Sequence, residues 1–184
     1  SRSYFNVSPS CICSSSIFVM NKYLNTTKDG FKVYYDDKIS HAVTHFQKHP
    51  ELISLVRKAL ENHNFNNDET RFDIDTKQKT GMSDLVTTSD NDDIIYAKRP
   101  LRDTYYRFVK NRKPEPTTFI TMELNKINNK ECKLFTAYVG QLTPPTPRPE
   151  KDSLEARMFW KNHALVYNKK DVVAGTETEK CSWE

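Results

Sequence analysis

The chain is 184 residues long, its formal net charge is +4, and 36% of its residues are hydrophobic. This length suits one domain with a substantial core, whereas so small a charge does not by itself indicate a nucleic-acid binder. The chain has only four glycines and contains neither a Gly-rich phosphate loop nor a nucleophile elbow, which argues against nucleotide-dependent enzymes and serine hydrolases. The four cysteines follow no zinc or disulfide spacing, so we expect no cofactor and a cytoplasmic location.

The Ser-rich segment 1–19 has no helical period, and its apolar run is too short to span a bilayer, so we expect no membrane partner. The segment after Asn168 is rich in charged residues and in residues with small side chains. We therefore expect a disordered extension over 1–19, one α+β domain over 20–168, and a loose C-terminal tail over 169–184.

The elements follow from hydrophobic periodicity and from breaks at proline. Strands are expected at 31–35, 71–75, 93–98, 104–110, 117–126, 132–139 and 164–167, and helices from Asp37, over 50–62 and over 152–160. The close spacing of the four strands between 93 and 139 predicts an antiparallel meander. The predicted fold is α+β, with N-terminal helices packed on one face of an antiparallel sheet of about four to six strands.

Positive charge is concentrated between Lys98 and Lys113, where seven cations accompany a single acid, Asp103. Aromatic residues interleave with these cations, and aromatic rings stack on bases. We therefore expect Lys98, Arg99 and Arg102 to bind RNA, together with Lys48. An ordinary solvated surface is the alternative interpretation.

Three groups of residues have side chains suited to phosphate chemistry. In the strand 104–110, Arg107 is placed to clamp a phosphate. Thr136 and Tyr138 alternate with Phe135 and Ala137, so we expect the first pair to line a cleft and the second pair to face the core. Imidazole takes and gives protons near neutral pH, which makes the histidines His41, His45 and His163 candidates for acid and base.

Zinc is a rival interpretation, because His41, His45 and His49 recur at every fourth residue. Pro50 disturbs the third position, and no glutamate follows His41 as in the zincin motif. We therefore expect no metal site.

The segments His41–Pro50, Tyr96–Arg99, Tyr106–Val109 and Leu134–Tyr138 together resemble the barnase–EndoU–colicin–RelE superfamily of ribonuclease toxins, including phage and polymorphic toxins of bacteria. The resemblance covers about residues 31–167. It implies a metal-independent endoribonuclease, in which a ribose 2′-hydroxyl attacks the adjacent phosphate.

The same resemblance implies the roles of the residues. His41 or His45 takes a proton, Arg107 or Lys98 and Thr136 hold the phosphoryl oxygens, and Tyr138 lies beside them. Which histidine is the base stays open, and His163 has no firm counterpart. The expected partners are transfer, messenger or ribosomal RNA and a neutralising antitoxin or immunity protein. A non-catalytic binding module, such as an antitoxin, an immunity protein or a phage accessory protein, remains the main alternative, with a zinc-binding protein beside it.

Overall fold

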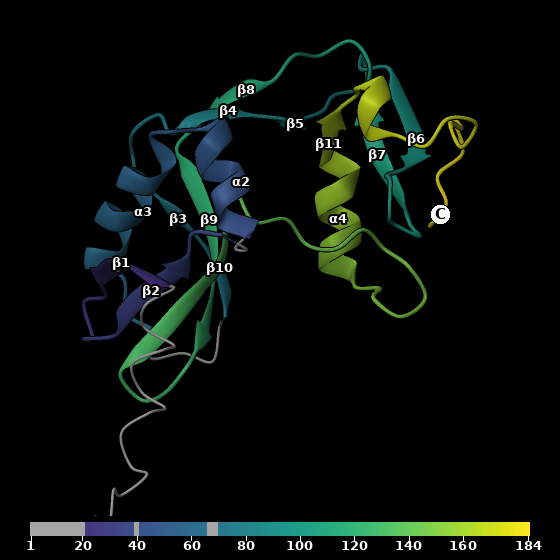
Figure 1. The fold of residues 1–184 in the computed structure, drawn as a ribbon. Helices are drawn as coiled ribbons and strands as arrows, with labels where there is room; N and C mark the ends of the chain where they lie inside the picture. The colour runs from purple at the N-terminus through teal and green to yellow at the C-terminus, as the bar shows by residue number, and fades with distance from the viewer. Residues whose placement is uncertain (1–20, 39–40, 66–69) are drawn as a thin grey trace, which may run out of the picture. The chain divides into compact units, whose positions relative to one another are not determined.

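The structure is a computed structural model that describes residues 21–38, 41–65 and 70–184 (Figure 1). Its strands are β1 (Asn21–Thr26), β2 (Lys32–Asp36), β3 (Arg71–Asp75), β4 (Gly81–Ser83), β5 (Leu85–Thr87), β6 (Ile94–Lys98), β7 (Tyr105–Val109), β8 (Glu115–Thr117), β9 (Phe119–Lys126), β10 (Glu131–Val139) and β11 (His163–Val166). Its α-helices are α2 (His41–Lys48), α3 (Leu52–Glu61) and α4 (Leu154–Asn162), and a 3₁₀ turn, η1, covers Lys169–Asp171.

The chain forms two compact units. The N-terminal unit joins the residues up to Ile74 with Ile120–Tyr138, and the C-terminal unit joins Asp75–Phe119 with Val139–Glu184. The domain expected over 20–168 therefore spans both units. The extension expected over 1–19 lies outside the described residues.

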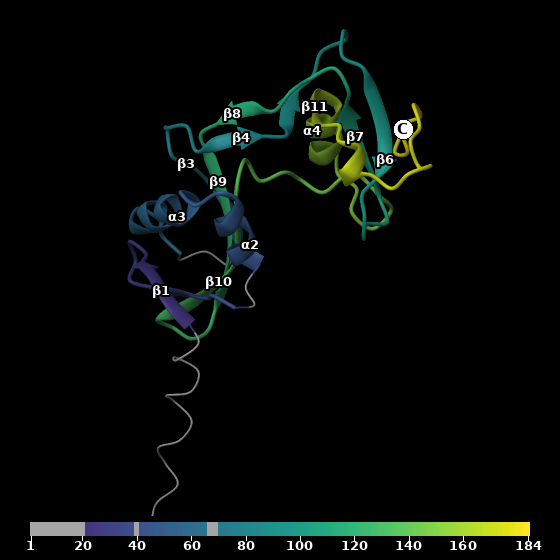
Figure 2. The ribbon, with the colours of Figure 1, turned by 45° about the horizontal axis from the view of Figure 1, so that its top comes forward.

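The N-terminal unit contains a five-stranded sheet in the order β1-β2-β10-β9-β3. β1 and β2 are antiparallel, whereas β10 runs parallel to β2. Alternate side chains along the central strands are buried, as the period of a strand requires; they include Val33, Met122, Leu124 and Leu134. The ring of Phe46 in α2 packs edge-to-face on Tyr35 of β2, and α2 and α3 lie next to β9 and β10 in both ribbon views (Figures 1 and 2).

The C-terminal unit contains a four-stranded sheet in the order β5-β11-β7-β6 and a two-stranded sheet of β4 and β8. β6 and β7 form an antiparallel hairpin, and β11 runs parallel to β7. One face of this sheet packs through Val86, Val109 and Ala164, and the other packs through Ala97 and Phe108.

Residues 169–184 differ from the loose tail that the sequence predicts. Val172 is buried against Phe108, and the backbone of Thr178 exchanges two hydrogen bonds with Tyr96 on β6. The ring of Trp183 packs edge-to-face on Tyr96. These contacts explain the order of the segment, because it covers the open edge of β6, where unpaired backbone groups would otherwise face water.

The predicted α+β class is confirmed, but the predicted arrangement of its elements is not. Helices are few among the described residues, strands β1 and β2 precede the first described helix, and the eleven strands lie in three sheets rather than one antiparallel sheet. The expected meander separates into β6–β7 in one unit and β9–β10 in the other. The chain between β7 and β9 forms β8, which pairs with β4 and does not extend the meander.

Candidate nucleic-acid interface

The predicted site residues divide between the two units. The N-terminal unit holds His41, His45, Lys48, Thr136 and Tyr138, and the C-terminal unit holds Lys98, Arg99, Arg102, Arg107 and His163. Neither unit contains the full set that the resemblance to ribonuclease toxins implies. Each group has to be judged by its own surroundings.

In the N-terminal unit, the structure brings His45 and Tyr138 together. Their ring centroids lie 6.0 Å apart, with the histidine on α2 and the tyrosine near the end of β10. Lys48 is exposed at the end of the same helix. His41 begins α2, but its side chain lies outside the described residues. Of the predicted site residues of this unit, these two are the pair whose side chains the structure shows in contact.

The facing of β10 differs from the prediction at two residues. Thr136 is only 8% exposed, whereas Phe135 is 49% exposed. Ala137 is buried, as expected. Thr136 alternates onto the same face as the buried Leu134, so its hydroxyl does not line an open cleft.

Arg107 is held inside the C-terminal unit rather than presented to a ligand. Its Nη1 donates to the Thr88 hydroxyl at 2.8 Å and to the backbone carbonyl of His163 at 2.9 Å. Its guanidinium also hydrogen-bonds the phenol of Tyr96. Burial, followed by a hydrogen bond to Cys181, raises the pKa of Tyr96 to about 12. These contacts indicate that Arg107 stabilises the fold of the C-terminal unit.

His163 lies at the junction of α4 and β11. Its Nδ1 lies 2.8 Å from the carbonyl oxygen of Phe159, and its ring stacks on the Phe159 ring with centroids 4.1 Å apart. The structure therefore brings His163 and Arg107 together, but the contact is made by the backbone carbonyl of His163 and not by its imidazole. The imidazole itself serves as a cap and packing group.

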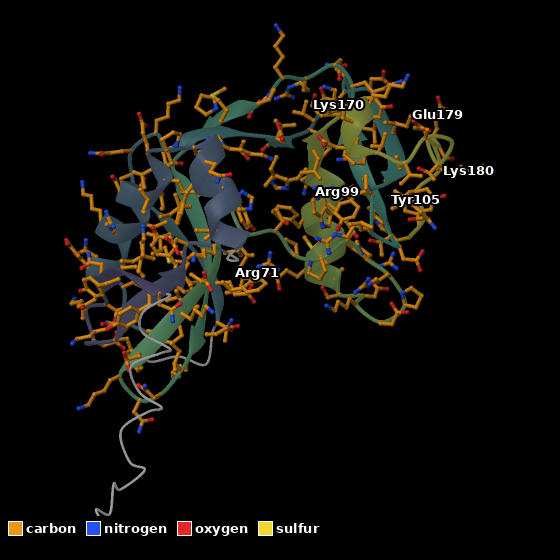
Figure 3. The ribbon with its side chains drawn as sticks, viewed as in Figure 1. Arg71, Arg99, Tyr105, Lys170, Glu179 and Lys180 are labelled. Carbon is orange, nitrogen blue, oxygen red and sulfur yellow. The ribbon has the colours of Figure 1, made fainter. Side chains whose placement is uncertain are left out.

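The end of the β6–β7 hairpin pairs cations with aromatic rings. Lys98 Nζ lies 5.5 Å from the ring centroid of Tyr105, and the Arg99 guanidinium lies 5.2 Å from that of Tyr106. Tyr105 and Tyr106 are neighbours on one strand, so their side chains occupy opposite faces of the hairpin. Each face thus carries one cation and one half-buried ring. One residue of each pair, Arg99 and Tyr105, is labelled in Figure 3.

One further cation belongs to this surface, and another lies apart from it. Arg102 is exposed in the turn and forms no ion pair with any residue in the described part of the chain. At the other end of β7, Lys110 Nζ lies 5.4 Å from the ring centroid of Tyr167. We call Lys98, Arg99, Arg102, Tyr105 and Tyr106 the basic hairpin.

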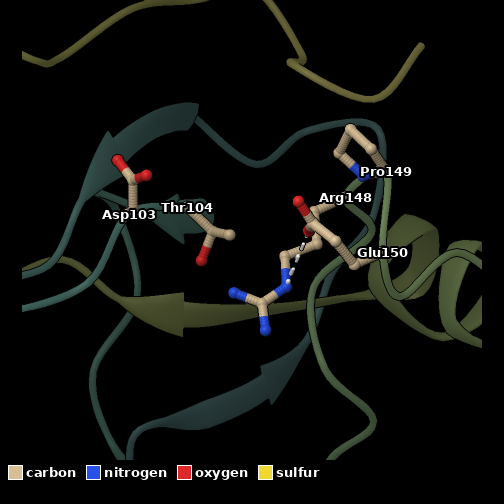
Figure 4. A pocket seen from close by; sticks show the side chains of 5 residues that line it. All are labelled: Asp103, Thr104, Arg148, Pro149 and Glu150. Carbon is tan, nitrogen blue, oxygen red and sulfur yellow. Dashed lines mark ion pairs between the residues drawn. The ribbon is translucent and has the colours of Figure 1, made fainter.

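A hollow of about 360 Å³ opens beside the basic hairpin, lined by Asp103, Thr104, Arg148, Pro149 and Glu150 (Figure 4). The Arg148 guanidinium extends toward Thr104, and its Nε lies 3.6 Å from a carboxylate oxygen of Glu150 (Figure 4). That Nε is buried and has no hydrogen-bond acceptor among the described residues. Asp103 also forms an ion pair with Lys98 at 3.3 Å, so acids partly offset the cations here.

The sequence indicated neither the contact of Lys110 with Tyr167 nor the place of Arg148 beside the basic hairpin. Lys110 and Tyr167 meet because β11 lies beside β7, and that pairing joins strands more than 50 residues apart. The contact of Lys98 with Tyr105 could be predicted from the strand pattern alone, because a two-strand hairpin places these residues opposite each other.

No group of three or more His, Cys, Asp or Glu side chains within the described ranges is arranged to hold a metal ion. None of the described helices is long and apolar enough to cross a membrane. Comparison with protein-family models, with curated proteins and with solved structures finds no match for this chain.

Proposed function

We propose that the protein binds single-stranded RNA through the basic hairpin. One observation carries the proposal: Lys98 and Arg99 each lie over a tyrosine ring, on opposite faces of one hairpin. Cations attract the phosphate backbone and aromatic faces stack on bases, which is the combination that single-strand binding requires. Arg102, which forms no ion pair within the described part of the chain, adds positive charge at the same turn, whereas Glu150 offsets the charge of the neighbouring Arg148.

Single-stranded RNA fits this surface better than duplex RNA does. Each tyrosine is half-buried, so it presents one edge or face to a ligand. Only unstacked bases can reach such rings, because bases in a duplex are stacked on one another. The hairpin end is also narrow, which suits a flexible strand that follows it from one face to the other.

The test is the affinity of the purified chain for a short labelled single-stranded RNA, measured by fluorescence anisotropy. Replacing both Lys98 and Arg102 with alanine is expected to weaken binding at least tenfold. A control with the same charge change replaces Lys28 and Lys58, two exposed lysines of the N-terminal unit, and is expected to bind like the wild type. Equal losses for the two double variants would contradict the proposal, because they would show only an effect of net charge.

Tyr105→Leu tests the stacking half of the proposal. Stacking of a base on an aromatic ring contributes about 1–3 kcal/mol, so affinity is expected to fall roughly 5- to 150-fold. Leucine keeps an apolar side chain at this position while removing the aromatic face. Unchanged affinity would show that the ring does not contact a base.

A second proposal, cleavage of the RNA, rests on the proximity of His45 and Tyr138. In this proposal the protein is a metal-independent endoribonuclease. His45 takes the proton of the 2′-hydroxyl as that oxygen attacks the adjacent phosphorus, and Tyr138 contacts the phosphate. The bond from phosphorus to the 5′-oxygen breaks, a second acid gives the leaving 5′-oxygen a proton, and a 2′,3′-cyclic phosphate remains. Cleavage of total RNA that persists in excess chelator, and that His45→Ala abolishes, would support it. Binding without turnover would instead favour the non-catalytic module.

A further inference from the structure

The turn between β6 and β7 holds a leucine in an unusual backbone conformation. The amide of Arg102 donates to the carbonyl of Arg99 at 3.0 Å, which closes a β-turn with Pro100 and Leu101 as its central residues. Leu101 has a φ of 61°. Proline first and positive φ second define a type II turn, whose second central position strongly favours glycine. A leucine there is strained relative to the residue that the turn prefers.

The leucine gains no burial in return. Its relative exposure is 104%, against 75% for Leu154, the next most exposed large apolar residue of the described chain. The folded protein therefore holds an apolar side chain fully in water, on a strained backbone, between Arg99 and Arg102. A single exposed apolar side chain is ordinary on a protein surface, but a strained backbone conformation is found most often at functional sites.

We propose that Leu101 is a wedge that inserts between adjacent bases of the bound RNA and separates them. This inference rests on the proposed RNA-binding function and adds that the bound RNA is unstacked at one step. Arginines on both sides of the leucine would hold the phosphates that flank the opened step, and leucine is among the apolar side chains that proteins insert between base steps. Tyr105, directly behind the turn, offers a half-buried ring to one of the separated bases, whereas Tyr106 packs against the core cluster of Ala97, Phe108 and Val172.

The surrounding charge favours RNA over a lipid surface as the occupant. A single apolar side chain is too little for stable attachment to a membrane, which takes two strong signals. A polyanion that also exposes apolar base faces matches both the cations and the leucine of this turn. Binding to anionic vesicles is accordingly an outcome of the test that counts against the wedge.

The experiment compares the full chain with Leu101→Gly and Leu101→Ala, using a short single-stranded RNA that carries 2-aminopurine next to adenine. Fluorescence of 2-aminopurine rises when the base is unstacked. The wild type is expected to raise the fluorescence on binding, and both variants are expected to bind about threefold to tenfold more weakly with little rise. Leu154→Ala, which removes the other highly exposed leucine, is expected to behave like the wild type.

Glycine at position 101 separates binding from folding. Because the turn prefers glycine there, Leu101→Gly is expected to keep or raise the thermal midpoint while it loses the unstacking signal. If Leu101→Gly binds and unstacks RNA like the wild type, the wedge is refuted while RNA binding by the hairpin stands. If the wild type itself binds no RNA, the proposed function fails and the wedge fails with it. Loss of anionic-vesicle binding in Leu101→Gly, with RNA binding unchanged, would also overturn the wedge.

Discussion

Arg107 shows how the surroundings of a residue determine what its side chain can do. The same guanidinium that suits a phosphate is here satisfied by a hydroxyl, a backbone carbonyl and a phenol of its own unit. Releasing those partners to bind a ligand would leave polar groups without hydrogen bonds in a partly buried place, which costs free energy. Arg102, exposed and without an ion pair among the described residues, meets no such obstacle.

Arg107→Ala is therefore expected to lower the free energy of unfolding by about 2–4 kcal/mol, because it removes charged hydrogen bonds and leaves their acceptors unpaired. Arg102→Ala is the matched control and is expected to change that free energy by less than about 0.5 kcal/mol. Urea denaturation measures both. An Arg107→Ala protein of wild-type stability that no longer binds or cleaves RNA would return the residue to the predicted catalytic role.

Tyr96 gives the C-terminal unit a pH dependence at high pH. Its pKa in the folded protein is about 12, above the ordinary value of 10.0, because burial disfavours the phenolate. The folded state thus binds this proton more tightly, and the resulting stabilisation is complete below pH 10 and is lost as the pH rises through 12.

The difference in unfolding free energy between the wild type and Tyr96→Phe is expected to shrink by on the order of 2 kcal/mol between about pH 10 and pH 12. Phenylalanine keeps the ring and has no proton to lose, so groups that titrate in both proteins cancel. Denaturant titrations at several pH values measure the difference. A difference that stays constant over this range would show that the phenol is not held in its neutral form.

At the scale of elements, local patterns predicted most of the longer strands but missed β1 and the short strands β4, β5 and β8, and they predicted the partners of the strands poorly. The alternation along Arg71–Asp75 and Glu131–Val139 is strong enough to mark each strand, and the expected positions differ from the observed ones by few residues. Pairing depends on residues far along the chain. Nothing near β10 in the sequence indicates that it runs parallel to β2, and nothing near β7 indicates that β11 will lie beside it.

The candidate site was predictable to the same degree. Lys98, Arg99, Tyr105 and Tyr106 come together through one local hairpin, so charge and alternation were sufficient to find them. The faces on which Phe135 and Thr136 lie could not be predicted, because both faces of β10 carry apolar residues in the sequence. Which face the helices cover then decides the matter, and the sequence does not show that choice.

Phe135→Ser is expected to lower the free energy of unfolding by no more than about 1 kcal/mol, because a half-exposed ring gives up little buried area. Phe65→Ser, which removes a ring that is 2% exposed in the same unit, is expected to cost about 3–5 kcal/mol. Chemical denaturation of the two variants makes the comparison. Similar losses would mean that Phe135 faces the core after all.

At the scale of the whole molecule, the chain has two hydrophobic cores, each built from two separate stretches. Both tryptophans of the chain, Trp160 and Trp183, belong to the C-terminal unit. Tryptophan fluorescence thus follows the unfolding of that unit, whereas far-ultraviolet circular dichroism follows both. Proteins with more than one compact unit often depart from a single two-state transition.

Leu134→Ala, in the core of the N-terminal unit, is expected to lower the free energy of unfolding of that unit by about 2–5 kcal/mol. It should lower the midpoint seen by circular dichroism while the midpoint seen by tryptophan fluorescence changes little. A single shared transition, displaced equally for both probes, would show that the two units unfold as one.

The salt dependence of RNA binding shows whether the basic hairpin contacts phosphates. For single-stranded RNA, the logarithm of the association constant falls with the logarithm of salt concentration at a slope of about −0.7 per neutralised phosphate, so three contacts from Lys98, Arg99 and Arg102 give about −2. Arg102→Ala is expected to reduce the slope by about 0.7 while leaving the thermal midpoint unchanged. A flat salt response of the wild type, or a slope that Arg102→Ala leaves untouched, would contradict the account of the basic hairpin as an RNA-binding surface.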